Sequence, residues 1–422
     1  HQLEDRGLVE ARPQSGYFVR QAKTSHAEPQ VRSTPEAPIP VDISQRLVRV
    51  LQAGTRPGVA PLAAALPAPE LLPVAALIRL YAGVARRHPD LLSGGSHINM
   101  DEPALVRQLV RRSLAWGGPI PAEEFVITNS CTESLGLCLR AVTKPGDTVA
   151  VESPAYYLNQ QLLETLGLKA LEIPTDPRTG MSLDALELAT RQGRIAACLL
   201  VSNGSNPLGC VMPDDKKRLF ATLTAARGVA VIEDDIYGDL HLGKERPWPI
   251  KAYDKAGSVM LCSSFSKSLS PSLRIGFVAA GRYRPAIALH KTISSGGTNP
   301  ITQHVLAEYL ESGAYDRHLR TLRRAYERQV EAMRLAVGRY FPAASRIAQP
   351  QGGYVLWVEL PEEFDTTRLY EQAITENLAY VPGELFSPSG MYRNCLRLNC
   401  GNPHTPEIED AVRRLGAIFC HP

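Results

Sequence analysis

Short runs of β-branched and apolar residues alternate with amphipathic stretches along the middle of the chain. Two of the amphipathic stretches, 132–142 and 214–227, repeat their apolar positions with the period of a helix. The strand candidates are the runs 125–128, 148–153, 196–202, 228–234, 259–265 and 274–281. This alternation predicts an α/β domain with a mainly parallel sheet.

The pattern changes near the carboxyl end. A long helical pattern runs from Thr302 to about Tyr340, and the segments GGYVLWVEL (352–360) and CLRLNC (395–400) then have the character of strands. We expect these segments to form a smaller α+β unit beside the large sheet.

The amino end has a different organisation. Residues 1–20 predict the end of a helix, a strand at 8–12, a turn at 13–16 and a second strand from Tyr17. The sequence begins with His1, and this first segment resembles the tail of a larger unit. Residues 21–41 follow with four prolines and no periodic apolar pattern, which predicts an extended linker.

The predicted division therefore has three parts. Residues 1–20 end one domain, 21–41 form the linker, and 42–422 form the main domain. Within the main domain we expect a large part at about 95–300 and a small part made of about 42–94 and 301–422. A chain of 422 residues is long enough for two or three domains.

Composition indicates the class of protein and its compartment, but says little about its function. Hydrophobic residues make up 44% and charged residues 21%, the usual balance of a soluble globular protein. The net charge of +3 neither requires nor excludes a nucleic-acid partner. The eight cysteines form no CxxC pair and mostly lie in apolar stretches, which favours a reducing cytoplasm. No apolar run is long enough to span a membrane, and no metal site is predicted.

The segment SFSKSLSPSLR places one lysine, Lys267, just after a predicted strand. Ser264 and Ser266 precede it, and Arg274 follows seven residues later. An amine can form an imine with an aldehyde, while hydroxyls and a guanidinium can bind a phosphate by charge-assisted hydrogen bonds. These are the groups that pyridoxal 5′-phosphate (PLP) requires, although a solvated surface lysine is the commoner role for this residue type.

Two further strand ends carry groups suited to the rest of that cofactor. Asp234 and Tyr237 form D-x-x-Y after a buried strand, where a carboxylate can keep a pyridine nitrogen protonated and a phenol can bind the ring oxygen. Asn206 precedes a Pro-x-Gly turn and can bind the same ring oxygen. The alternatives are acids that cap the next helix, which applies to Asp235 as well, and a simple turn at Asn206.

The turns after two more strands complete the candidate site. Ser130, Cys131 and Thr132 lie between a strand and a helix, where free backbone N–H groups attract phosphate, but Ser130 could equally be a plain N-cap. Tyr156, in ESPAYY, is placed to stack on a cofactor ring or simply to pack.

Arg397 lies within a predicted strand near the carboxyl end, between apolar neighbours. A guanidinium there can bind a substrate carboxylate in bidentate fashion, and the alternative is a strand arginine that points to solvent. The candidate motifs follow one another at successive strand ends, and together they supply each contact that PLP needs.

With these motifs in place, residues from about 65 to 417 resemble the class I and II aminotransferases of the fold-type I PLP superfamily. The motifs that carry the resemblance are ITNSCTESL, VESPAYY, SNPLG, VIEDDIYGDL, SFSKSLSPSLRIGF, ESGAYDRHLRTLRRAYERQ, PQGGYVLWVELP and LRLNC. The resemblance implies that Lys267 holds the cofactor covalently, Asp234 pairs with its ring nitrogen, and Arg397 takes the substrate α-carboxylate. It also implies that Asn206 and Tyr237 bind the phenolic oxygen, and that Arg274 with Ser264 and Ser266 binds the phosphate.

The segment RGLVEARPQSGYFV is similar to the wing of a GntR-type winged helix. A winged helix linked to an aminotransferase-like domain is the layout of the MocR group of bacterial transcription regulators. The resemblance implies a homodimer that binds DNA through its winged helix and senses an amine, an amino acid or PLP. Two positions depart from the family pattern, since His97 stands roughly where a tyrosine is usual and Ser130 replaces a glycine.

Two functions remain open at this stage, and both use the same residues. The chain is either the effector domain of a regulator or an active aminotransferase that moves an amino group between an amino acid and a 2-oxo acid. The wing favours the regulator, because a stand-alone aminotransferase has no use for one. A PLP lyase or decarboxylase fits less well, because Arg397 suits a carboxylate that is retained.

Overall fold

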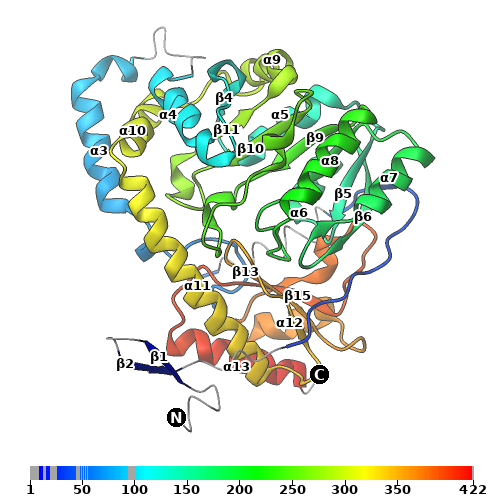
Figure 1. Cartoon of the computed structure of the whole chain (residues 1–422). Coiled ribbons are helices and arrows are strands. Elements are labelled where there is room, and N and C mark those ends of the chain that lie inside the picture. Colours follow the sequence, from blue (N-terminus) through cyan, green and yellow to red (C-terminus); the bar gives the residue numbers. More distant parts are fainter. Residues whose placement is uncertain are drawn as a thin grey trace.

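The architecture described here is that of a computed structural model of the whole chain. It describes residues 9–12, 16–19, 26–43, 56–93 and 101–420, with a few positions between 48 and 54. Two lobes, each built on its own sheet, are joined by one long diagonal helix (Figure 1).

A nine-stranded sheet forms the centre of the upper lobe. Its strand order is β3-β6-β5-β8-β9-β10-β11-β4, with β7 paired to β6. The strands are β3 (Ile39–Pro40), β4 (Phe125–Thr128), β5 (Thr148–Ser153), β6 (Lys169–Asp176), β7 (Gly180–Met181), β8 (Ala197–Leu200), β9 (Ala230–Asp234), β10 (Val259–Ser264) and β11 (Gly276–Ala279). The central neighbours β6, β5, β8, β9 and β10 run parallel. The strands β3 and β11 run antiparallel to them, and β4, which pairs antiparallel with β11, runs again in the direction of the central strands. The mainly parallel α/β sheet predicted from the sequence is confirmed.

Helices surround this sheet because its central strands are apolar and buried on both faces. They are α3 (Val74–Arg87), α4 (Pro103–Ser113), α5 (Cys131–Val142), α6 (Tyr157–Thr165), α7 (Leu183–Gln192), α8 (Asp214–Ala226) and α9 (Arg284–Ser295). The predicted helices 132–142 and 214–227 correspond to α5 and α8.

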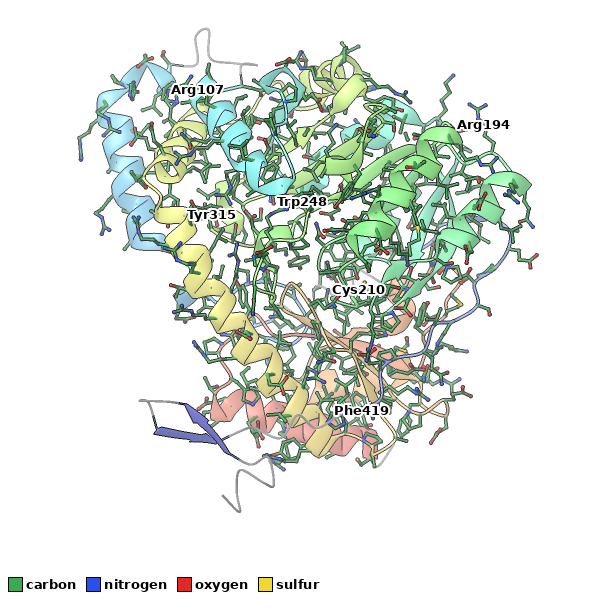
Figure 2. The ribbon with its side chains drawn as sticks, viewed as in Figure 1. Arg107, Arg194, Cys210, Trp248, Tyr315 and Phe419 are labelled. Atoms are coloured by element: carbon green, nitrogen blue, oxygen red, sulfur yellow. The ribbon has the colours of Figure 1, made fainter. Side chains whose placement is uncertain are left out.

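The lower lobe is the predicted smaller α+β unit. Its antiparallel sheet has the order β12-β13-β15-β14, and two helices cover it. The elements are β12 (Arg346–Ile347), β13 (Val355–Glu359), β14 (Val381–Pro382), β15 (Cys395–Asn399), α12 (Thr366–Thr375) and α13 (Pro406–Cys420). Figure 2 labels Phe419 of α13 in this lobe, where its ring contacts those of Phe341 and Tyr380.

The prediction of one long helical stretch from Thr302 to about Tyr340 is wrong in one respect, because two helices occupy it. They are α10 (Pro300–Glu311) and α11 (Ala314–Tyr340). Gly313 separates them with a φ of 66°, a left-handed conformation that glycine adopts without steric cost. As a result α10 packs with α3 and α4 in the upper lobe, while α11 crosses to the lower lobe (Figure 1). The predicted boundary between a small part ending at about residue 94 and a large part beginning at about 95 stays a prediction. The helices on its two sides, α3 and α4, both contact α10.

The predicted amino-terminal hairpin is present as β1 (Val9–Arg12) and β2 (Gly16–Val19), which pair antiparallel. The helix end predicted before it lies outside the described residues, and so does His97. Within the described part of the chain, no helix is long and apolar enough to cross a membrane. All eight cysteines are unpaired, and only Cys420 is exposed.

Candidate active site

A cavity of about 180 Å³ opens at the edge of the large sheet where the parallel strands end. Because β5, β8, β9 and β10 are parallel neighbours, the turns that follow them meet at this edge. Eleven of the predicted site residues line the cavity: Ser130, Cys131, Thr132, Tyr156, Asn206, Asp234, Tyr237, Ser264, Ser266, Lys267 and Arg274. The motifs that are dispersed in sequence therefore converge on one place.

Lys267 follows β10, and its amine reaches the floor of the cavity. Its Nζ donates a hydrogen bond of 2.6 Å to the Ala65 carbonyl oxygen. Burial, together with the nearby Arg397 guanidinium, lowers the pKa of Lys267 to about 8, although Asp234 acts in the opposite direction. Near neutral pH a much larger fraction of this amine is therefore unprotonated and nucleophilic than that of a surface lysine.

This lowered pKa predicts the pH dependence of cofactor attachment. Only the neutral amine attacks an aldehyde, so the attachment rate should fall about tenfold for each pH unit below 8 and level off above it. Stopped-flow absorbance after mixing cofactor-free protein with PLP measures this rate. A rate that keeps rising to pH 10 would show that Lys267 keeps the ordinary lysine pKa.

Asp234 ends β9 and is 4% exposed. Its Oδ1 accepts a hydrogen bond of 3.1 Å from the Ile236 N–H and one of 3.3 Å from the Cys131 thiol. Burial raises the pKa of Asp234 to about 6, against the lowering effect of these two hydrogen bonds. A buried carboxylate whose pKa is raised in this way is well suited to a cationic partner such as a pyridinium.

Tyr237 and Asn206 both line the cavity. The Tyr237 hydroxyl is buried and makes no hydrogen bond of good geometry among the described residues, although the Asn206 side chain lies near enough to lower its pKa against the raising effect of burial. Asn206 is held by Arg397, whose Nη1 donates to Asn206 Oδ1 over 3.3 Å. Tyr156 also lines the cavity, and its ring lies 4.6 Å from that of Tyr157.

The turn between β4 and α5 offers an anion site at a helix amino terminus. Ser130 is the N-cap, and its Oγ accepts from the Glu133 N–H at 3.1 Å, so the plain capping role is present. Thr132 is exposed at the same turn and lines the cavity, beside the free first N–H groups of α5.

Arg274 and two serines stand opposite this turn. Arg274 has a φ of 50°, a costly conformation for arginine that fits a functional constraint. Its side chain is exposed and lines the cavity. The Ser266 N–H donates to Ser264 Oγ at 3.3 Å, which shapes the turn before Lys267.

Gly276 of β11 allows the close approach on which this anion site depends. A Cβ at Gly276 would lie 2.5 Å from the Ser130 carbonyl carbon and 2.8 Å from the Cys131 nitrogen. Replacing Gly276 by Ala should therefore displace the turn, weaken PLP binding and destabilise the protein by about 1–3 kcal/mol. Thermal unfolding with and without PLP measures both effects. Gly193→Ala is the control, because its Cβ would meet open space, and equal behaviour of the two variants would contradict the prediction.

Arg397 extends from β15 of the lower lobe toward the site. It is fully buried, so the alternative of a strand arginine pointing to solvent is excluded. Its Nη2 donates to the Ala63 carbonyl and its Nη1 to Asn206, while its Nε has no partner among the described residues. A buried cation without a carboxylate partner can bind an anion of the ligand.

Sequence reasoning missed an ionic network directly behind the site. Asp235 does not cap a helix through its side chain; it accepts from Asn203 at 2.8 Å and pairs with Arg246. Arg246 also pairs with Asp239 at 2.7 Å, and Asp239 with Arg112 at 2.9 Å. Only the two acids belong to a motif, and the arginines come from segments with no local signal.

The long diagonal helix α11 also contacts this ionic network. Figure 2 labels Tyr315 near its upper end, and the Tyr315 hydroxyl lies 2.9 Å from Ser268 Oγ and 3.2 Å from Asp239 Oδ2. The turn that carries Lys267 is thereby tied to the ionic network and to the helix between the lobes.

The residues present fit PLP on structural grounds. The site combines an amine of lowered pKa, a buried carboxylate, a buried phenol next to Asn206, and a helix amino terminus in the same cavity as Arg274. When bound, PLP supplies an aldehyde that condenses with amines and a ring that withdraws electrons from the amine's α-carbon.

Comparison with known proteins decides the family. Residues 93–415 match the aminotransferase class I and II family. The chain belongs to this family. Its members use PLP, and PLP is the cofactor of this chain.

Relatives of the chain fall into two groups. It is 38% identical to the HTH-type transcriptional regulator YjiR of Escherichia coli over 98% of this chain and 88% of the relative. It is also 38% identical to YdcR, a second HTH-type transcriptional regulator of E. coli, over 99% and 89%. Among solved structures, it is similar to the α-aminoadipate aminotransferase LysN of Thermus thermophilus in complex with N-(5′-phosphopyridoxyl)-L-leucine. That similarity has a TM-score of 0.80 and 28% identity, and covers 89% of this chain and 94% of LysN.

Proposed function

We propose that this chain is the PLP-dependent sensing part of a bacterial transcription regulator of the MocR type, and that it responds to an amine, an amino acid or PLP. The observation that carries the proposal is the extent of the similarity. The two regulators align with 98% and 99% of the chain, whereas the aminotransferase family match begins only at residue 93. The hairpin β1–β2 and residues 26–40 thus belong to the part shared with regulators.

We assign the cofactor contacts as follows. Lys267 holds PLP covalently, Asp234 pairs with the ring nitrogen, and Asn206 with Tyr237 binds the ring oxygen. The anion site made by Ser130, Cys131, Thr132, Ser264, Ser266 and Arg274 binds the phosphate. Tyr156 stacks on the ring. The lining of one cavity by all of these residues supports the assignment.

The incoming ligand would meet groups from both lobes. Arg397 would bind its carboxylate from below, because the guanidinium is buried, is bonded to Asn206 and has an Nε that meets no acceptor among the described residues. Lys267, once released from the aldehyde by the incoming amine, remains beside the cavity as an amine that can accept a proton. If Lys267 then transfers that proton to another carbon, the site turns over as an enzyme. If it does not, the site acts as a sensor.

An active aminotransferase is the second candidate. The specific observation in its favour is that Lys267, Asp234 and Asn206 line one cavity, with Arg397 bonded to Asn206 beside it. The similarity to LysN is consistent with this function. A spectral change that stays stable after an amino acid is added supports sensing. Full conversion of the cofactor to its amine form supports an enzyme.

DNA binding tests the regulator directly. We propose that the full-length gene product is a homodimer whose winged helix binds DNA near its own or a neighbouring gene. Binding should be sequence-selective and should weaken as salt rises, because phosphate contacts release counterions. A mobility-shift assay with upstream DNA, with and without a panel of amino acids, measures this. No shift under any ligand, combined with full transamination, would favour the enzyme instead.

A further inference from the structure

Most of the segment predicted to be an extended linker lies along the folded domain and contacts both lobes. Residues 26–40 run up one side of the molecule from the lower lobe to β6 of the upper lobe (Figure 1, dark blue). At the lower end, the Ala27 carbonyl accepts from the Ile347 N–H at 2.9 Å, and Pro29 is buried. At the upper end, β3 pairs with β6, and Val41 just beyond it is 7% exposed. We name residues 26–40 the strap.

Arg32 is the central anchor of the strap in the lower lobe. Its Nη2 donates to Glu359 Oε1 at 3.0 Å and to Asn394 Oδ1 at 2.7 Å, and its guanidinium lies 5.0 Å from the centre of the Tyr392 ring. The Gln30 N–H reaches the other oxygen of Glu359 at 2.9 Å. The Arg32 side chain is only 26% exposed, so these contacts are partly shielded from solvent.

The partners of Arg32 lead to the ligand site by two short routes. Asn394 immediately precedes β15, the strand that carries Arg397, and Glu359 pairs with Cys395 in the same sheet. Tyr392 reaches the upper lobe, because its hydroxyl lies 3.1 Å from Ser153 Oγ.

The second route ends at the cavity wall. Ser153 Oγ donates to the buried Glu172 of β6 at 2.8 Å, and Ser153 stands three residues before Tyr156, which lines the cavity. The Ala155 N–H in between donates to the Phe386 carbonyl of the lower lobe at 2.9 Å. The turn that presents Tyr156 is thus fixed by groups from both lobes.

We propose that the strap positions the ligand site, with Arg32 as a positioning residue, and that ligand binding in turn tightens the strap. This inference rests on the proposed function, because it assigns the ligand site to PLP and an amine. A ligand that contacts Lys267 above and Arg397 below fixes the two lobes relative to each other. The strap is attached to both lobes, so its contacts depend on the same relative position, and the coupling must be reciprocal.

The position of the strap also suits it to transmit the ligand-bound state of the domain to the amino-terminal hairpin. It joins the ligand-binding domain to the hairpin β1–β2, and it lies wholly outside the aminotransferase match that begins at residue 93. The two E. coli regulators align with nearly the whole chain, the strap included. A segment with these properties serves communication between domains rather than the chemistry at Lys267.

Ligand binding by variants of the intact chain tests the positioning role. The probes are PLP and then aminooxyacetate, which carries both a nucleophilic amine and a carboxylate. Arg32→Ala should raise the dissociation constant for aminooxyacetate about fivefold or more. Tyr392→Phe, which removes only the hydroxyl beside Ser153, should have an effect in the same direction. The double variant should bind less weakly than the two separate effects predict together, since they share one route.

The control is Arg87→Ala, which removes an exposed arginine paired with Glu308 on the other side of the upper lobe. It should bind both probes as the unmodified chain does. If Arg32→Ala and Tyr392→Phe also bind aminooxyacetate unchanged, the strap has no positioning role and this inference is overturned.

Hydrogen exchange provides the reciprocal measurement, which a merely structural role would not affect. Backbone amides of residues 26–40 should exchange more slowly when aminooxyacetate is added to the PLP-loaded chain. Unchanged exchange in the strap, with the probe bound, overturns the inference but leaves the proposed function intact. Failure of the unmodified chain to bind PLP would instead overturn the proposed function, and the inference with it.

Discussion

Lys267→Ala should abolish the visible absorbance that the PLP-loaded protein shows. Among the described residues, Lys267 is the only lysine that lines the cavity, so no other described amine can replace its covalent link to the aldehyde. Any proton transfer at the α-carbon of a bound amino acid should also slow by about 10²–10⁴-fold, the usual contribution of a positioned base. Absorbance spectroscopy and single-turnover kinetics measure the two effects.

Lys216→Ala is a matched control for this experiment. Lys216 is half-buried and also has a pKa lowered by burial, but it lies outside the cavity, where it donates to Thr179 and the Gly180 carbonyl. The control should retain the full absorbance. A Lys267→Ala protein that keeps its band, with no release of the cofactor by added amines, would remove Lys267 from its assigned role.

Asp234→Asn should weaken PLP binding and slow reaction with amines by about 10²–10³-fold. The physical reason is the loss of a buried anion opposite a ring cation, a change that costs about 3–5 kcal/mol in buried pairs. The variant should also absorb differently, because the ring nitrogen loses its proton. Equilibrium dialysis of PLP and spectral titration with an amino acid measure these effects.

The neighbouring substitution Asp235→Asn separates this effect from damage to the fold. Asp235 is equally buried, but its partners are Asn203 and Arg246 behind the site. It should lower thermal stability while leaving the ring's absorbance unchanged. Identical spectra for the Asp234→Asn variant and the unmodified chain would show that the ring nitrogen has another partner.

The parts of the fold with strong local signals were predictable from the sequence. The strands β4, β5, β8, β9, β10 and β11 are apolar runs bounded by turns, and each lies within its predicted range. The strand β6 was not predicted, because KALEIPTD contains Lys169, Glu172 and Pro174. Glu172 is tolerated inside because Ser153, Ser387 and Ser389 from distant segments donate to it.

The helix break at Gly313 and the packed strap were missed for a similar reason. A single glycine within an amphipathic pattern does not by itself end a helix, and the left-handed φ is set by the crossing of α11 to the lower lobe. The strap has the composition of a free linker. Its order comes from partners such as Glu359 and Tyr392, which lie more than three hundred residues away.

At the site, the sequence predicted which residues meet but not how they are held. Strand order brings Lys267, Asp234 and Asn206 together, and that follows from parallel topology. The burial of Arg397 and the contact of the Cys131 thiol with Asp234 depend on side-chain packing, which no local pattern encodes.

The most direct measurement is chemical trapping of the cofactor on the intact chain. Borohydride reduction of the PLP-loaded protein, followed by digestion and mass spectrometry, should place the phosphopyridoxyl group on the peptide that contains Lys267, and prior addition of aminooxyacetate should prevent the labelling. Labelling of a different lysine, or no labelling at saturating PLP, would contradict the account.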